Sequence, residues 1–287
     1  MLDTSSCAAR KSSHASLCEA SRAGMWVCER SRLGFFGVSA LIFVVSTAVT
    51  IVWCAPMSAM GEMPMPGGWT MSMAWMLMPG QTWASAGASF VGMWVVMLVA
   101  MMMPCLVPML WRYRKAVSRT SGTRLSLLTA LVGVGYFFVW TLFGIAAFPL
   151  GVTLSAIEMQ LPELARAVPT GVGLVVLIAG ALQFSAWKAH HLAYCRESPG
   201  RGCTLPANAG TAWRHGLRLG IHCGYCCAGL TAILLVIGVM DLRAMAAVMV
   251  AITVERLAPY GERVARAIGA VVVATGLFLI ARAAGLG

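Results

Sequence analysis

Residues 127–150 read LLTALVGVGYFFVWTLFGIAAFPL, and this stretch decides the fold because it contains no charged side chain. A helix needs roughly 20 apolar residues to cross about 30 Å of hydrocarbon, so the run predicts a membrane-spanning helix. The whole chain agrees, since 59% of its 287 residues are hydrophobic and 11% are charged. An ordinary soluble domain carries roughly 25% charged residues. The sequence therefore predicts an all-α, polytopic transmembrane helix bundle.

Six other apolar runs flank this stretch and predict about seven spans in total. They cover residues 34–54, 86–110, 170–187, 219–239, 243–258 and 267–283. The run 243–258 is the weakest because it is short, contains Glu255 and stops at Pro259, so a tilted or re-entrant element is the alternative. The longest polar stretch, 188–218, has too few apolar residues for a core of its own. One bundle over residues 34–283 is expected.

The basic residues separate sharply between alternate connecting segments. The N-terminal tail and residues 111–126, 188–218 and 255–266 hold 18 of the 21 Lys and Arg residues. Because cytoplasmic loops attract positive charge, we expect the N-terminus inside and the C-terminus outside a bacterial inner membrane. The net charge of +11 is thereby explained by topology, and no nucleic-acid partner is expected.

Residues 1–33 are rich in Ser, Ala and Arg and show no sustained apolar period, which predicts a flexible cytoplasmic tail. The first apolar run ends in Cys54-Ala55-Pro56-Met57 rather than in a small-x-small cleavage site. We therefore expect a retained anchor and not a cleaved signal peptide.

Cysteine and histidine gather between residues 188 and 227, which hold five of the ten cysteines and four of the five histidines. On a helix, Cys223, Cys226 and Cys227 share one face, and His222 lies one turn from Cys226. His191 and Cys195 would share a face if the preceding helix continues. The candidate metal ligands are Cys195, Cys203, Cys223, Cys226, Cys227, His190, His191, His215 and His222.

Thiolates and imidazoles at this density indicate a transition-metal site near the cytoplasmic face. Four ligands could close a tetrahedral zinc site, and two or three thiolates could hold Cu(I). The spacing alone does not choose between these metals. The competing interpretation is that each cysteine is a small buried hydrophobic residue.

Methionine crowds residues 57–80, the predicted outer loop. Thioethers are neutral ligands that prefer soft ions such as Cu(I) and Ag(I), so the loop is a candidate surface for collecting or releasing copper. The alternative is an interfacial segment, because Trp69, Trp75 and Trp83 accompany the methionines. The candidate ligands are Met57, Met60, Met63, Met65, Met71, Met73, Met76 and Met78.

A second set of methionines follows the span 86–110. Met93, Met97 and Met101 recur at every fourth residue, and Met102 and Met103 follow. This stripe could carry a soft ion between the outer loop and the inner thiolates, although Met is also a common filler of helix contacts. Glu255 is a further candidate for this path, since ionisable groups inside apolar runs are candidates for function. Its alternative is a simple ion pair with Arg256 or a loop lysine.

Four motifs resemble the bacterial domain-of-unknown-function family 2182, a group of metal-binding integral membrane proteins. They are MLVAMMMP at 97–104, KAHHLAYCRESP at 188–199, GIHCGYCC at 220–227 and ERLAP at 255–259. The resemblance covers residues 86–283 and implies a polytopic bundle with a metal role for Cys195, Cys223, Cys226 and Cys227. That family usually has a further cysteine where this chain has His191, which could substitute as a mixed sulfur and nitrogen ligand.

The favoured function is non-enzymatic handling of a transition metal, copper above zinc, by transport, delivery or insertion into a partner. No catalytic residue is assigned. No glycine loop followed by Lys-Ser/Thr occurs, which argues against ATP-driven pumping by this chain. The alternatives are a membrane thiol-disulfide oxidoreductase using Cys223 and Cys226, and an accessory subunit of a larger membrane complex. The expected partners are the lipid bilayer and a soluble metal chaperone or metalloenzyme, and an oligomer remains open.

Overall fold

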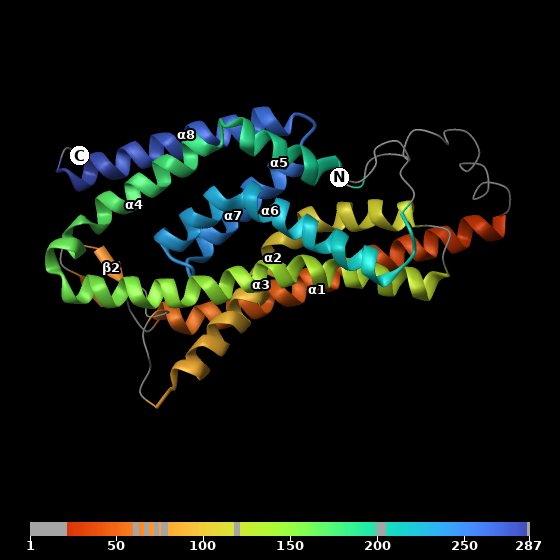
Figure 1. Cartoon of the computed structure of the whole chain (residues 1–287), viewed down its shortest axis with the longest axis horizontal. Coiled ribbons are helices and arrows are strands. Elements are labelled where there is room, and N and C mark those ends of the chain that lie inside the picture. Colours follow the sequence, from red (N-terminus) through yellow and green to blue (C-terminus); the bar gives the residue numbers. More distant parts are fainter. Residues whose placement is uncertain are drawn as a thin grey trace.

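The computed structural model describes residues 22–59, 63–65, 69–71, 75, 80–117, 121–197, 199 and 205–285. Within these ranges, the side chains of residues 22–30, 56–59, 63, 64, 70 and 71 lie outside the description. Residues 1–21 of the predicted 1–33 tail lie outside it, and residues 22–33 are not a flexible tail but the first part of the helix α1 (Arg22–Ala59). What is described is a bundle of helices with one small hairpin (Figure 1).

Six helices are long and apolar enough to cross a membrane. They are α1 (Arg22–Ala59), α2 (Trp83–Ala116), α3 (Gly122–Gln160), α4 (Pro162–Leu182), α6 (Ala209–Ile237) and α8 (Gly261–Ala283). Two shorter helices, α5 (Ala186–Glu197) and α7 (Leu242–Leu257), and the strands β1 (Met63–Met65) and β2 (Trp69–Met71) complete the order. The predicted all-α polytopic bundle is confirmed, and the chain is a multi-pass membrane protein.

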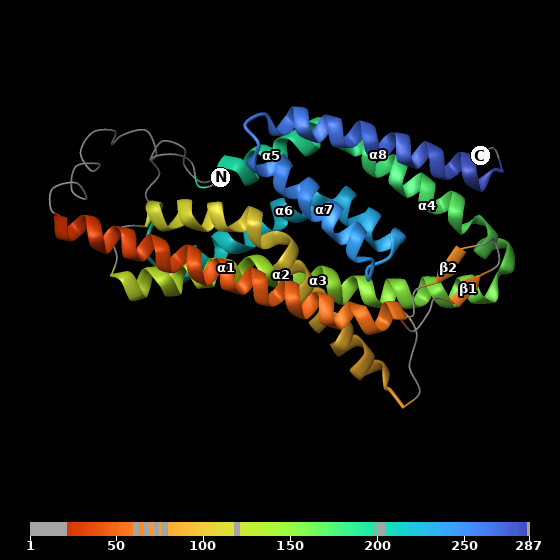
Figure 2. The same ribbon diagram turned by 180° about the vertical axis from the view of Figure 1, so that it is seen from behind.

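The weak sixth run, 243–258, is the helix α7, which has 16 residues and is not among the six span-length helices. Helix α7 nevertheless reverses the direction of the chain between α6 and α8. Helices α1, α3, α6 and α8 run one way along the long axis of the molecule, and α2, α4 and α7 run back (Figures 1 and 2). The alternation expected for seven runs is therefore present, with α7 as its short member.

The predicted fourth span, 170–187, differs from the helix that forms. Helix α4 begins at Pro162 and ends at Leu182, because proline suits the first helical turn and the apolar residues after Leu182 belong to a turn and to α5. Phe184 and Trp187 are apolar enough to extend the run in the sequence. Position 183 is instead a polar Gln, which is buried.

Small residues bring the helices together. A Cβ added at Gly180 of α4 would lie 2.7 Å from the Val273 backbone nitrogen of α8, and one at Gly276 would lie 2.6 Å from that of Leu177. Close backbone approach of this kind is how helices associate in lipid, where no hydrophobic force drives them together. Large apolar side chains such as Leu142 and Phe278 point outward, as a lipid-facing surface requires.

Helix α2 forms much of the interior. Its Trp94 is buried and donates from Nε1 to the Trp140 carbonyl oxygen of α3 at 2.9 Å. Pro104 and Pro108 lie inside the helix, and α2 bends between its two halves (Figure 2). Proline removes a backbone donor and crowds the preceding turn, which accounts for the bend.

Candidate metal centre

Five buried cysteines from three helices form a cluster, here called the thiol cluster: Cys105, Cys195, Cys223, Cys226 and Cys227. Cys105 comes from α2, Cys195 from α5 and the other three from α6. No side chain of the five is more than 3% exposed. The predicted convergence of the α6 cysteines holds, since the Cys223 and Cys227 sulfurs lie 4.0 Å apart.

Hydrogen bonds link the sulfurs into a chain. Cys195 bonds to Cys226, and Cys226 bonds to Cys227. The pKa of Cys195 is raised well above its ordinary value because its thiol bonds to Cys226 and because it is buried. At the other end of this row of sulfurs, the Tyr136 hydroxyl of α3 lies 2.8 Å from the Cys223 sulfur.

The Arg256 guanidinium of α7 lies among three of these sulfurs. Its Nη2 is 2.9 Å from Cys223 and 3.4 Å from Cys227. Its Nη1 is 3.6 Å from Cys105. The sequence predictions did not include Arg256 or Cys105 in the site. The available signal was a basic residue inside the apolar run 243–258, which deserved the same interpretation as its neighbour Glu255.

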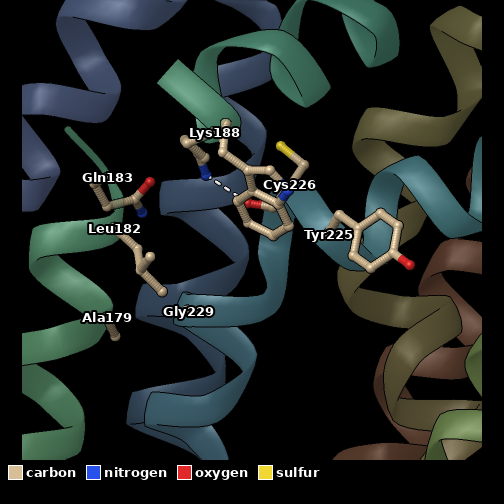
Figure 3. A pocket seen from close by; sticks show the side chains of 8 residues that line it. Ala179, Leu182, Gln183, Lys188, Tyr225, Cys226 and Gly229 are labelled. Carbon is tan, nitrogen blue, oxygen red and sulfur yellow. Dashed lines mark hydrogen bonds between the residues drawn. The ribbon is translucent and has the colours of Figure 1, made fainter. Parts of the chain in front are cut away.

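Glu255 does not pair with Arg256, although the two are adjacent. Its Oε2 accepts from Lys188 Nζ at 2.7 Å, and its Oε1 accepts from Gln183 Nε2 at 3.1 Å. Lys188 also donates to the Cys226 carbonyl oxygen at 2.7 Å (Figure 3). Burial opposes the charge on Lys188, but Cys226 and Glu255 outweigh it and raise the lysine pKa. Of the two predicted pairings for Glu255, the lysine is therefore the partner.

A small cavity adjoins this ion pair. Its volume is about 10 Å³, and Gln183, Lys188 and Cys226 contribute to its lining, which is room for roughly one water molecule. Figure 3 shows Gln183 and Lys188 on one side and Cys226 on the other. Among the described atoms, Gln183 Oε1 is buried with no hydrogen-bond partner.

Two histidines meet beside the thiol cluster. His191 Nδ1 of α5 lies 2.9 Å from His222 Nδ1 of α6, and Tyr194 stacks on His222 with ring centroids 3.7 Å apart. Both histidines are partly exposed. Burial and the neighbouring His190 lower the pKa of His191, which favours the neutral imidazole that binds metals. His190 is exposed, with its ring 5.3 Å from that of His191.

The other predicted ligands lie elsewhere. His215 stacks on Tyr113 of α2 with ring centroids 5.4 Å apart, and none of its described hydrogen bonds reaches the thiol cluster. Cys203 lies outside the described residues. The connecting segment therefore contributes no described ligand, and the histidine pair comes from α5 and α6.

No three His, Cys, Asp or Glu side chains within the described ranges are arranged as a preformed metal site. One pair nevertheless suits a soft ion. Two sulfurs that each lie about 2.3 Å from one metal are at most about 4.6 Å apart, and the Cys223 and Cys227 sulfurs are separated by 4.0 Å. A single ion can bridge them without a change in their separation.

The Met-rich segment 57–80 is described only in part. Met60, Met73, Met76 and Met78 lie outside the described residues, and Met57, Met63 and Met71 are described by backbone alone. Met63 of β1 pairs with Met71 of β2. Trp69 donates from Nε1 to the Ala165 carbonyl oxygen of α4 at 2.8 Å. The predicted copper-binding role of the segment 57–80 is not tested by these contacts and stays a prediction.

The five methionines of the predicted path all point into the bundle. Met93, Met97, Met101, Met102 and Met103 are each at most 5% exposed. Cys105 Sγ donates to the Met102 carbonyl oxygen at 3.0 Å, so the stripe ends beside the thiol cluster. This arrangement suits both a core filler and a path, and the path stays a prediction.

The family model of the PpoB2 copper chaperones matches residues 91–279. The chain belongs to this family. The match supports a copper-related role for this PpoB2-family protein. It does not support the family 2182 name that the four motifs suggested. The matched range contains all five cysteines of the thiol cluster, Arg256 and the histidine pair, and it omits residues 57–80. No curated protein and no solved structure matches the chain.

Proposed function

We propose that this PpoB2-family chain is a non-enzymatic membrane protein that binds Cu(I) on the thiol cluster and delivers it to a partner metalloprotein. The observation that carries the proposal is the gathering of five buried sulfurs from α2, α5 and α6 within the range that matches a copper chaperone family. Soft thiolates suit both Cu(I) and zinc, and the copper chaperone family favours copper between these two metals.

Cys223 and Cys227 are the first pair of ligands in this proposal, because their 4.0 Å separation suits one ion. Cys226 and Cys195 are joined to this pair through hydrogen bonds and would accept the ion in turn. Exchange between neighbouring sulfurs requires no large backbone movement, which is a useful property in a protein that must release its metal.

The histidine pair is the proposed entrance. His191 and His222 are partly exposed, whereas the thiol cluster is buried, so an ion from a soluble donor would reach the imidazoles first. If the basic segments lie on the cytoplasmic side of a bacterial inner membrane, this entrance also faces the cytoplasm. The buried methionines of α2 and the segment 57–80 are the proposed route and outer exchange surface.

The hydrogen-bond pattern favours metal binding over the thiol oxidoreductase alternative, which required Cys223 and Cys226 to act as a pair. The Cys223 sulfur instead contacts Tyr136, Arg256 and Cys227. Cys226 bonds to Cys195 and Cys227. The accessory-subunit alternative has no specific contact in its favour.

The test is Cu(I) binding to protein purified without oxygen in detergent. A competing chelator that reports Cu(I) by absorbance measures stoichiometry and affinity, and metal analysis of the purified protein tests zinc. The variant with both Cys223→Ser and Cys227→Ser should bind Cu(I) at least about 100-fold more weakly, because loss of an outer-shell partner of a ligand already costs about 10–100-fold in affinity. Cys54→Ser, a buried cysteine outside the matched range, is the control and should bind as the parent does.

Equal binding by the double variant and the parent would refute the proposal. Absence of Cu(I) binding together with a reversible disulfide, measured as two thiols lost on mild oxidation, would instead support the oxidoreductase.

A further inference from the structure

Arg256 is a permanent positive charge placed inside the thiol cluster. The side chain is 5% exposed, and a guanidinium stays protonated in proteins. Three of the five sulfurs lie within 3.6 Å of its two terminal nitrogens. Its Nε is buried and has no hydrogen-bond partner among the described atoms.

The nearby carboxylate does not neutralise Arg256. Glu255 is bound to Lys188 at 2.7 Å, so those two opposite charges compensate each other. Tyr136, which also reaches Cys223, is neutral as a phenol. The thiol cluster must therefore balance the guanidinium, since an uncompensated buried charge is strongly unfavourable.

The charge balance differs between metals. Metal-bound cysteines are thiolates, so two cysteines and one Cu(I) form a group of charge −1. With Arg256, the total is zero. One thiolate already balances Arg256 before the metal binds, and the second cysteine releases one proton on binding. The same two thiolates with Zn²⁺ or Cd²⁺ are neutral, and Arg256 leaves a net buried charge of +1.

We propose that Arg256 makes the thiol cluster selective for univalent soft cations by serving as the fixed counter-charge of a Cu(I) dithiolate. The guanidinium keeps its hydrogen bonds to the sulfurs while the metal binds their remaining lone pairs. Arg256 is thus a specificity-determining residue and not a ligand. This inference rests on the proposed function, because it concerns the same site.

The test compares affinities for Ag(I), a stable stand-in for Cu(I), and for Cd²⁺ in the parent and in Arg256→Gln. Both are measured by competition on detergent-purified protein without oxygen, and the thiolate-to-Cd²⁺ absorption band reports binding at sulfur. We expect the preference for Ag(I) over Cd²⁺ to fall at least tenfold in Arg256→Gln and to change less than threefold in Arg256→Lys, which retains the charge.

The matched control is Arg196→Gln. Arg196 donates to the Glu255 and Pro259 carbonyl oxygens at the same end of α7, but it contacts no sulfur in the described part of the chain. Its loss should weaken local packing without changing the ratio of the two affinities. A merely structural role for Arg256 would likewise lower both affinities together and leave their ratio unchanged.

An unchanged ratio in a folded Arg256→Gln protein overturns the inference while leaving the proposed function intact. Failure of the parent to bind Ag(I) and Cu(I) refutes the proposed function itself. If Arg256→Gln does not fold, Cys105→Asp provides the second measurement, since it places a carboxylate near Nη1 and supplies the counter-charge. It should shift the preference toward Cd²⁺ at least tenfold relative to Cys105→Asn, and an equal ratio in these two variants overturns the inference.

Discussion

Gly216 lies where α3 and α6 approach too closely for a side chain. A Cβ added there would meet the Val132 carbonyl oxygen and would lie 3.1 Å from both the carbonyl carbon and the Cα of Val132. These are backbone atoms of a helix, so they cannot rotate out of the way. The substitution Gly216→Ala must therefore push the two helices apart at this contact.

The magnitude follows from two opposing effects. Overpacking of a tight contact costs about 1–3 kcal/mol, and replacing Gly by Ala inside a helix returns about 1 kcal/mol. The expected net loss is up to about 2 kcal/mol. At roughly 2–4 °C per kcal/mol for a chain of this size, the melting midpoint should fall by up to about 8 °C.

The same separation reaches the thiol cluster. Tyr136 lies one turn after Val132 on α3, and its hydroxyl is 2.8 Å from the Cys223 sulfur. Because α3 and α6 each supply one side of this bond, moving them apart lengthens it. We expect Cu(I) affinity to fall several-fold along with stability.

The assay is thermal unfolding in detergent, followed by loss of the monodisperse size-exclusion peak. The control is Gly133→Ala on the α3 side of the same helix pair, where an added Cβ meets nothing within 4 Å. The melting midpoint of Gly133→Ala should equal that of the parent or exceed it by a few degrees. A Gly216→Ala protein that melts at or above the parent temperature and binds Cu(I) equally well would refute the reasoning.

Three further results are expected. Lys188→Met should cost about 3–5 kcal/mol because it leaves the buried Glu255 carboxylate unpaired, and adding Glu255→Gln should recover part of the loss; a midpoint equal to that of the parent would contradict this. The lowered pKa of His191 means that the unfolded chain binds more protons, so the stability this histidine contributes is present above its ordinary value of 6.5 and is lost as pH falls. The melting midpoint should therefore drop less between pH 7 and pH 5 in His191→Gln than in the parent, and equal drops would remove this role. Replacing the eight methionines of residues 57–80 by Leu should weaken Ag(I) binding at the outer segment while leaving the midpoint unchanged, and unchanged binding would return the segment to an interfacial role.

The apolar runs predicted the bundle because span length depends on local composition alone. The run 127–150, for example, lies within α3. Boundaries were harder, as in 170–187, where Phe184 and Trp187 kept the sequence apolar beyond the end of α4. Neither residue continues that helix, because the turn at 183–185 separates α4 from α5.

The α6 part of the site was also predictable from sequence. Helical spacing placed Cys223 and Cys227 on one face, and the 4.0 Å between their sulfurs agrees. The contributions of Cys105 and Arg256 were not predictable, because they lie 118 and 29 residues from Cys223 and Cys227 respectively along the chain. Only the packing of α2 and α7 against α6 brings them to the sulfurs.

Helix α7 explains why two adjacent ionisable residues serve different partners. Successive residues on a helix point about 100° apart, so Glu255 faces Lys188 of α5 while Arg256 faces the thiol cluster. Pro259 follows closely, and α7 ends at Leu257, which holds both side chains at the end of a short helix within the bundle. The charged residues and the following proline, which made the run 243–258 a doubtful span, are therefore the features that place a charge beside the cysteines.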